Sequence, residues 1–207
     1  MLLKMFRNRV ADMDLYTNIY VIADENSKEA VVIDPGDAVD KVSNYIENMS
    51  LKLKYIILTH CHADHTAGLK KLKDYYPSSK ILIHESDFAG LIDESINMCD
   101  EVGVANNYVE ADITLKDGDE VTFGDIDAKI IHTPGHTAGS MCILINDALF
   151  TGDTLFKRMY GRTDLKTGSE EDIHKSISKL LDLPEGTIIY PGHGAISIIR
   201  EERENYA

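Results

Sequence analysis

The sequence predicts an α+β fold in which mixed β-sheets are covered by helices. Each half of the 207-residue chain contains a run of short strand-like segments with helical segments interspersed. The first two strands, at 19–24 (IYVIAD) and 29–34 (EAVVID), are joined by a polar turn. This order of elements favours mixed sheets over a doubly wound parallel sheet.

The first half of the chain alternates between strands and helices. The strand at 29–34 stops at the turn signal Asp34-Pro35-Gly36, and a helix follows over about 38–49. The continuous apolar run at 55–59 (YIILT) is typical of a buried strand. The elements predicted after it are a helix from Leu69, a strand at 80–85, a helical segment at 86–93 and a loop or flap at 94–110.

The second half begins with strands that are separated by Asp-Gly, Gly-Asp and Asn-Asp turn signals. Ser169 and Asp172 form a capping pattern that predicts the start of a helix. The strands are expected at 113–115, 120–123, 128–133, 141–145, 148–151 and about 187–191, with a terminal helix at 198–206.

The net charge of −14 opposes binding to nucleic acid or to an anionic membrane surface. The first ten residues are charged and lack the apolar stretch of a signal peptide, and no later run approaches a transmembrane span. Three widely spaced cysteines argue against a disulfide framework. We therefore expect a soluble, cytoplasmic protein with no nucleic-acid or membrane partner.

Seven side chains of metal-binding type lie in segments that follow predicted strands. Three histidines and an aspartate crowd into residues 59–65 (THCHADH). Protonated imidazoles would repel one another, and buried neutral ones each need a hydrogen-bond or coordination partner. A metal ion satisfies several of them at once. The full set is His60, His62, Asp64, His65, His136 (in TPGHTAGS), Asp153 (in TGDTLF) and His193 (in YPGHG).

Seven ligands exceed what one tetrahedral zinc ion binds, so the set indicates two metal ions. Imidazole with carboxylate suits zinc, and iron or manganese are alternatives. His60 and His62 alternate in extended backbone and point the same way, whereas Asp64 and His65 lie where a helix begins and face a second ion. By the same alternation, Cys61 is predicted to face away from the metals.

The order and spacing of THCHADH, TPGHTAGS, TGDTLF and YPGHG resemble the motif series of the metallo-β-lactamase fold hydrolases over most of the chain. The resemblance implies a four-layer αββα sandwich formed by residues 1–207 as a single domain. It implies that Asp153 bridges the two metal ions. The other ligands divide into His60, His62 and His136 on one ion and Asp64, His65 and His193 on the other.

Two such ions, about 3.5–4 Å apart, would hold a bridging water and lower its pKa to about 7. The resulting hydroxide would attack an electrophilic carbonyl, with the oxyanion stabilised by one metal. Asp64 and Asp153 are the candidates for carrying the released proton, in addition to binding metal.

Within this family, the segment around GRTD resembles the glyoxalase II-like thioesterases, also called hydroxyacylglutathione hydrolases, which implies a small-molecule thioester substrate. Arg162 is the first candidate for binding a substrate carboxylate, and a structural pair with Asp164 is the alternative. Lys157 and Tyr160 are further substrate-binding candidates. The chain is expected to act as a monomer or homodimer.

Three alternatives stay open. THCHADH and GRTD also resemble the iron-dependent glutathione persulfide dioxygenases, in which one iron would be held by His60, His136 and Asp153. The substrate of a hydrolase could instead be another small ester or a lactone. A metal-stabilised binding module is the third alternative, although structural zinc sites are usually closed and rich in cysteine. Asp34 is interpreted as a turn residue, and support of the metal loop from behind is the other interpretation.

Overall fold

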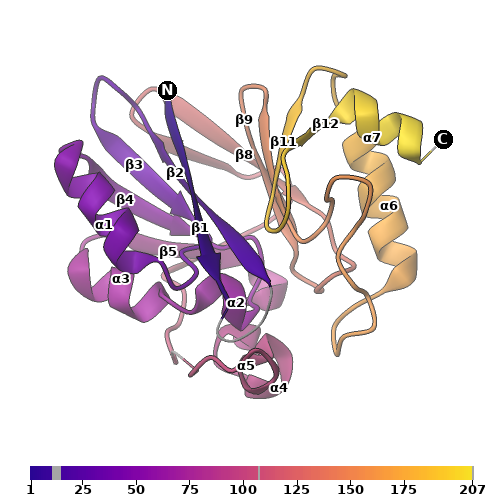
Figure 1. Ribbon diagram of the computed structural model, residues 1–207, viewed down its shortest axis with the longest axis horizontal. Coiled ribbons are helices and arrows are strands. Elements are labelled where there is room, and N and C mark those ends of the chain that lie inside the picture. Colours follow the sequence, from indigo (N-terminus) through magenta and orange to yellow (C-terminus); the bar gives the residue numbers. More distant parts are fainter. Residues whose placement is uncertain (11–14, 107, 207) are drawn as a thin grey trace.

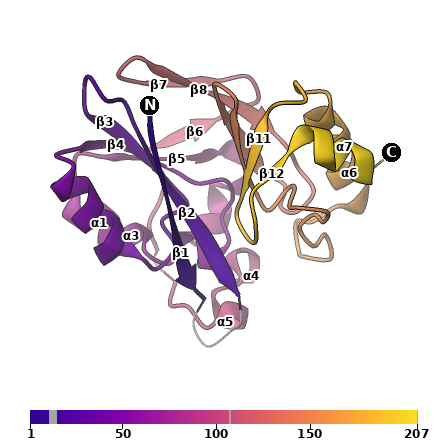
Figure 2. The same cartoon turned by 45° about the horizontal axis from the view of Figure 1, so that its top comes forward.

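Two six-stranded mixed sheets pack face to face in the computed structural model, and helices cover the outer face of each sheet (Figure 1). The structure describes residues 1–10, 15–106 and 108–206. The predicted αββα sandwich is confirmed. A second view shows the helices of the two halves on opposite sides of the sheets (Figure 2).

The amino-terminal sheet follows the order of the sequence. Its first three strands pair antiparallel, and the next three add in parallel. Parallel neighbours require crossover connections, and helices supply two of them. The strands are β1 (Leu2–Arg9), β2 (Tyr16–Ala23), β3 (Glu29–Ile33), β4 (Lys52–Ile57), β5 (Lys80–His84) and β6 (Ile113–Leu115).

The carboxy-terminal sheet is antiparallel except where β10 pairs in parallel with β11, across the connection that contains the longest helix. Its strands are β7 (Glu120–Phe123), β8 (Ile126–His132), β9 (Met141–Ile145), β10 (Ala148–Gly152), β11 (Ile188–Pro191) and β12 (Ser197–Ile198).

Two pairs of helices form the outer layers. α1 (Val39–Asn48) and α3 (Leu69–Tyr75) cover the first sheet, and α6 (Glu170–Leu181) and α7 (Ile199–Asn205) cover the second (Figure 1). The Ser169 hydroxyl accepts a hydrogen bond from the Asp172 amide at the start of α6, as the capping pattern predicts. The shorter helices are α2 (Ala63–Thr66), η1 (Glu85–Asp87), η2 (Ala89–Leu91), α4 (Glu94–Asn97) and α5 (Cys99–Val102).

Three apolar clusters hold the four layers together. Along β3, Val32 packs under the helices of the first sheet, while its neighbours Val31 and Ile33 face the second sheet. Along β9, Ile143 joins that central cluster and Cys142 packs under α6. Successive strand residues point to opposite faces, so strands buried on both faces read as continuous apolar runs.

The structure departs from the sequence analysis at residues 2–9, at 94–110 and at β12, which was not predicted. Residues 2–9 form the edge strand β1. Its side chains are partly charged and only half-buried, so the segment lacks the apolar pattern by which a strand is predicted. The segment 94–110 was predicted as a loop, but it contains α4 and α5, which are too short for a helical period to be visible. Within the described residues, no helix has the length and apolarity that crossing a membrane requires.

Candidate metal centre

Four loops meet at one edge of the two facing sheets. They follow β4, β8, β10 and β11 and, together with the short helix α2 after β4, carry all seven predicted metal ligands. Backbone hydrogen bonds link these loops, because the Met141 amide donates to the Thr59 carbonyl and the Gly192 amide donates to the Gly152 carbonyl. A Cβ on Gly192 would lie 2.6 Å from the His65 ring, so only glycine allows this close approach.

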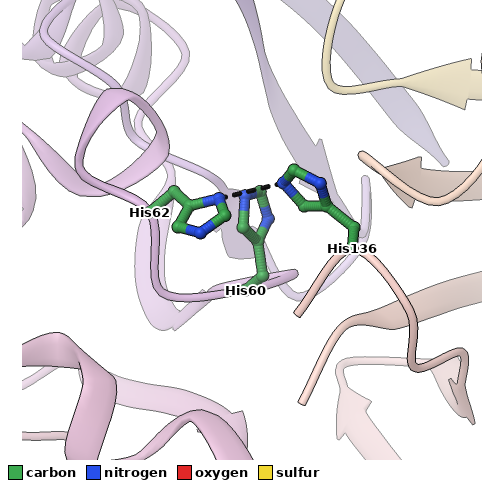
Figure 3. A group of neighbouring side chains, drawn as sticks. All are labelled: His60, His62 and His136. Carbon is green, nitrogen blue, oxygen red and sulfur yellow. Dashed lines mark hydrogen bonds between the residues drawn. The ribbon is translucent and has the colours of Figure 1, made fainter. Parts of the chain in front are cut away.

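One group consists of three histidines whose rings converge (Figure 3). His62 Nδ1 lies 2.9 Å from His136 Nε2. The His60 ring packs edge-on against both, with centroids 4.7 Å from His62 and 4.8 Å from His136. Their candidate ligand atoms lie within 4.8 Å of one another.

The second group consists of Asp64, His65 and His193. His65 Nε2 lies 3.2 Å from His193 Nε2 and 3.5 Å from Asp64 Oδ2, and His193 Nε2 lies 3.2 Å from the same carboxylate oxygen. Asp153 lies between the groups. One of its oxygens is 3.6 Å from His136 Nε2 and 3.3 Å from His193 Nε2, and the other is 3.3 Å from His65 Nε2.

The donor set and its burial fit metal ions. His60 is 1% exposed, and its Nε2 has no hydrogen-bond partner among the described residues. Burial and the neighbouring histidines hold the pKa of His60 well below its usual value, and burial and His136 lower that of His62 to about 3. Neutral imidazoles that converge on one point offer lone pairs to a cation. Binding of metal by the seven side chains stays a prediction.

Four of the histidines are oriented by contacts at their other ring nitrogen, and in His60 this contact joins Nδ1 to the Thr59 hydroxyl oxygen at 3.0 Å. His65 Nδ1 lies 2.9 Å from Asp34 Oδ2. His136 Nδ1 lies 2.8 Å from the Arg162 carbonyl oxygen. His193 Nδ1 lies 2.9 Å from the Tyr16 carbonyl oxygen. Such contacts fix the tautomer that presents Nε2 to a metal.

Asp34 therefore does more than form a turn. Asp34 directly follows β3 and has a left-handed backbone with φ +51°. Its buried carboxylate also accepts hydrogen bonds from the Thr59 amide and hydroxyl. Because the same carboxylate contacts His65, Asp34 supports the metal loop from behind, the reading not preferred in the sequence analysis.

Asp87 is a structural contributor that the sequence analysis missed. Its buried carboxylate accepts hydrogen bonds from the Cys61 amide (3.0 Å), the Thr137 hydroxyl (2.7 Å) and the Gly139 amide (2.7 Å). These donors belong to the loops that carry His60 and His136, so Asp87 ties the two loops together. The available signal was its position after β5, because the ends of parallel strands meet at one sheet edge.

Cys61 faces away from the ligands, as predicted. It is fully buried in the apolar cluster beneath the helices of the first sheet, and burial raises the pKa of its thiol well above the usual value. A neutral thiol in this environment is not a metal ligand.

A pocket of about 500 Å³ opens beside the ligands. Tyr160 and Arg162 line it, whereas Lys157 is not among its lining residues and pairs with Glu201 at 3.4 Å. The Arg162 guanidinium binds Asp164 through two nitrogens at 2.7 and 2.8 Å. The Arg162–Asp164 ion pair, the alternative interpretation of Arg162, is thus present at the wall of the pocket.

Metal uptake by the metal-free protein at pH 7 is expected to release protons. Burial alone would lower the pKa of His193, but the carboxylates of Asp153 and Asp64 raise it to about 10. His193 is therefore charged at pH 7 and must lose its proton to bind a metal. Zinc titration in weak buffer with a pH indicator should record about one proton or more per chain. Uptake of zinc without proton release would contradict this assignment.

The chain matches known proteins along nearly its whole length. A model of the metallo-beta-lactamase superfamily matches residues 12–193. An uncharacterized protein of Mycobacterium leprae is 36% identical over 91% of each chain. The human mitochondrial persulfide dioxygenase ETHE1 is 32% identical over 90% of this chain and 69% of its own length.

Solved structures agree with these matches. The BLEG-1 B3 metallo-beta-lactamase superposes with a TM-score of 0.88 at 31% identity, covering 98% of this chain and 97% of its own. ETHE1 from Myxococcus xanthus has a TM-score of 0.82 at 28% identity, covering 99% and 83%. The protein TTHA1623 in a di-iron-bound form has a TM-score of 0.82 at 26% identity, covering 93% and 95%.

Proposed function

The chain belongs to the metallo-β-lactamase superfamily of metal-dependent enzymes, and we propose that it is a binuclear hydrolase that cleaves a small thioester. One observation carries the proposal. The candidate ligand atoms form a three-histidine group (His60, His62 and His136) and a second group (Asp64, His65 and His193). A third group of His60, His65 and Asp153 joins the two, and Asp153 contacts histidines of both. A single ion would leave one group without a partner. The likeness to a solved metallo-beta-lactamase and to a di-iron protein supports two-metal hydrolysis.

The seven candidate ligands would bind two metal ions. One ion would be held by His60, His62 and His136, and the other by Asp64, His65 and His193. Asp153 would contact both ions. Bound metal would supply an activated water and polarise the carbonyl of the substrate.

The surrounding residues would position the substrate and move the proton. The pocket beside Asp153 would hold the acyl or thiol part, and Asp64, 3.2 Å from His193 Nε2, could carry the proton to the leaving thiolate. Cys61 is buried and faces away, so it is not placed to act as a nucleophile.

Thioester cleavage by protein purified without chelators tests the proposal. Zinc- and iron-loaded protein is expected to hydrolyse one or more members of a panel of acyl thioesters, read from loss of thioester absorbance. The His60→Ala variant serves as the inactive control, because it removes a ligand without touching the pocket lining. Equal rates for the two proteins, or two metals bound without turnover of any panel member, would overturn the hydrolase.

The second candidate is an iron-dependent persulfide dioxygenase. Relatives with that name support it rather than thioester hydrolysis, because they are 32% identical over most of this chain. His60, His136 and Asp153 would then hold a single iron. About one iron per chain together with oxygen uptake on a persulfide would establish it, whereas two metals per chain and no oxygen uptake would exclude it.

A further inference from the structure

The pocket beside the candidate metal centre has apolar walls. Seven of its lining side chains are aliphatic, thioether or aromatic, and they come from three separate segments of the chain: Leu15, Met98, Val102, Phe156, Met159, Tyr160 and Leu165. Such a surface gains free energy by burying alkyl or aryl groups and offers nothing to compensate the desolvation of a charge.

The charges around the pocket do not favour an anion. Arg162 is the only lysine or arginine among the described lining residues, and Asp164 already neutralises it through a two-point contact. Glu101 adds a negative charge to the wall, and the whole chain carries −14. An anionic thiol such as glutathione would therefore lack a free cationic partner within the part of the wall that the structure describes.

Met98 stands out on this wall because of its backbone. It joins α4 to α5 with φ +62° and ψ +24°, a left-handed conformation that a long side chain seldom adopts. α5 lies near α2, the helix that carries Asp64 and His65 (Figure 1). Backbone strain of this kind is common at ligand-binding positions. Here it coincides with a side chain that forms part of the pocket.

We propose that this pocket selects substrates with an uncharged apolar group, an alkyl or aryl acyl chain on a neutral thiol, and that Met98 is a specificity-determining residue. The proposal rests on the proposed hydrolase and names its substrate class. It narrows the small-molecule thioester of the sequence analysis to one with a neutral thiol, unlike the glutathione thioesters from which the hydroxyacylglutathione hydrolases take their name.

The first experiment compares a neutral thioester with one that is anionic in its acyl group and one that is anionic in its thiol. Metal-loaded protein is assayed with hexanoyl-N-acetylcysteamine, succinyl-N-acetylcysteamine and S-hexanoylglutathione. The kcat/KM of the first is expected to exceed the other two by roughly tenfold or more. Equal or higher kcat/KM for either anionic thioester would overturn the proposal while leaving the hydrolase intact.

A binding measurement separates the two proposals. Calorimetry with the uncleavable thioethers S-hexyl-N-acetylcysteamine and S-hexylglutathione reports on the pocket without turnover. Tighter binding of the neutral thioether supports the pocket's preference even if no thioester is cleaved, in which case only the hydrolase fails. Equal or tighter binding of S-hexylglutathione overturns the pocket's preference.

Two variants assign the preference to residues. Met98→Gly suits the left-handed backbone and removes the apolar side chain, so the chain should stay folded while the preference for hexanoyl falls several-fold. Ser50→Gly is the matched control, since Ser50 has φ +53° and lies exposed outside the pocket lining. Asp164→Asn frees Arg162 and should improve binding of S-hexylglutathione. An unchanged preference in both Met98→Gly and Asp164→Asn would contradict the roles of these residues.

Discussion

The Asp153→Ala variant is expected to lose metal and turnover together. Asp153 contacts His65, His136 and His193, which belong to both ligand groups, so its removal disturbs both groups directly. Outer contacts of metal ligands are worth about 10–100-fold in affinity or activity, and loss of a shared ligand should lower turnover by at least roughly 100-fold. Elemental analysis and the thioester assay on the same preparation measure both effects.

Asp147→Ala is the matched control for that experiment. Asp147 is an exposed aspartate in the turn that precedes β10, the strand that leads to Asp153. Its removal is expected to leave metal content and turnover unchanged. If Asp153→Ala retained two metals per chain and full activity, the candidate metal centre would not be the active site.

The Asp87→Ala variant is expected to be less stable and to bind metal more weakly. The change leaves the Cys61 amide, the Thr137 hydroxyl and the Gly139 amide without their acceptor in a buried place. Each unsatisfied buried donor costs about 1–3 kcal/mol, so the free energy of unfolding should fall by about 3 kcal/mol or more. Urea unfolding of the metal-free protein measures this loss.

Weaker metal binding should accompany the loss of stability, because the loops that carry His60 and His136 are no longer tied together. We expect a fall in zinc affinity of roughly 10–100-fold, measured by competition with a chelating dye. Glu85→Ala, an exposed change in the same short helix η1, should affect neither quantity by much. Unaltered zinc affinity in Asp87→Ala would show that Asp87 contributes to folding alone.

The sequence by itself predicted mixed sheets covered by helices and a set of seven candidate ligands, and the four-layer order and the division of the ligands between two ions came from the resemblance to the metallo-β-lactamase fold hydrolases. Strands buried on both faces read as apolar runs such as YIILT, and metal-type side chains follow several of them in distinctive motifs. These are local signals, because a strand, a turn and a ligand-bearing loop lie within about ten residues of one another. The edge strand at 2–9 was not predicted, because an edge strand is only half-buried and its apolar–polar alternation is weak.

Only the tertiary structure decided what surrounds those ligands. Asp34 lies 31 residues from His65, and the gaps from Asp34 and Asp87 to their other partners are 25 to 52 residues, so neighbouring residues do not identify those partners. The pocket wall likewise combines Leu15, Met98 and Phe156 from distant segments. Hydrogen-bond acceptance and pocket polarity depend on which side chains folding brings within a few ångströms, and a single sequence does not contain those distances.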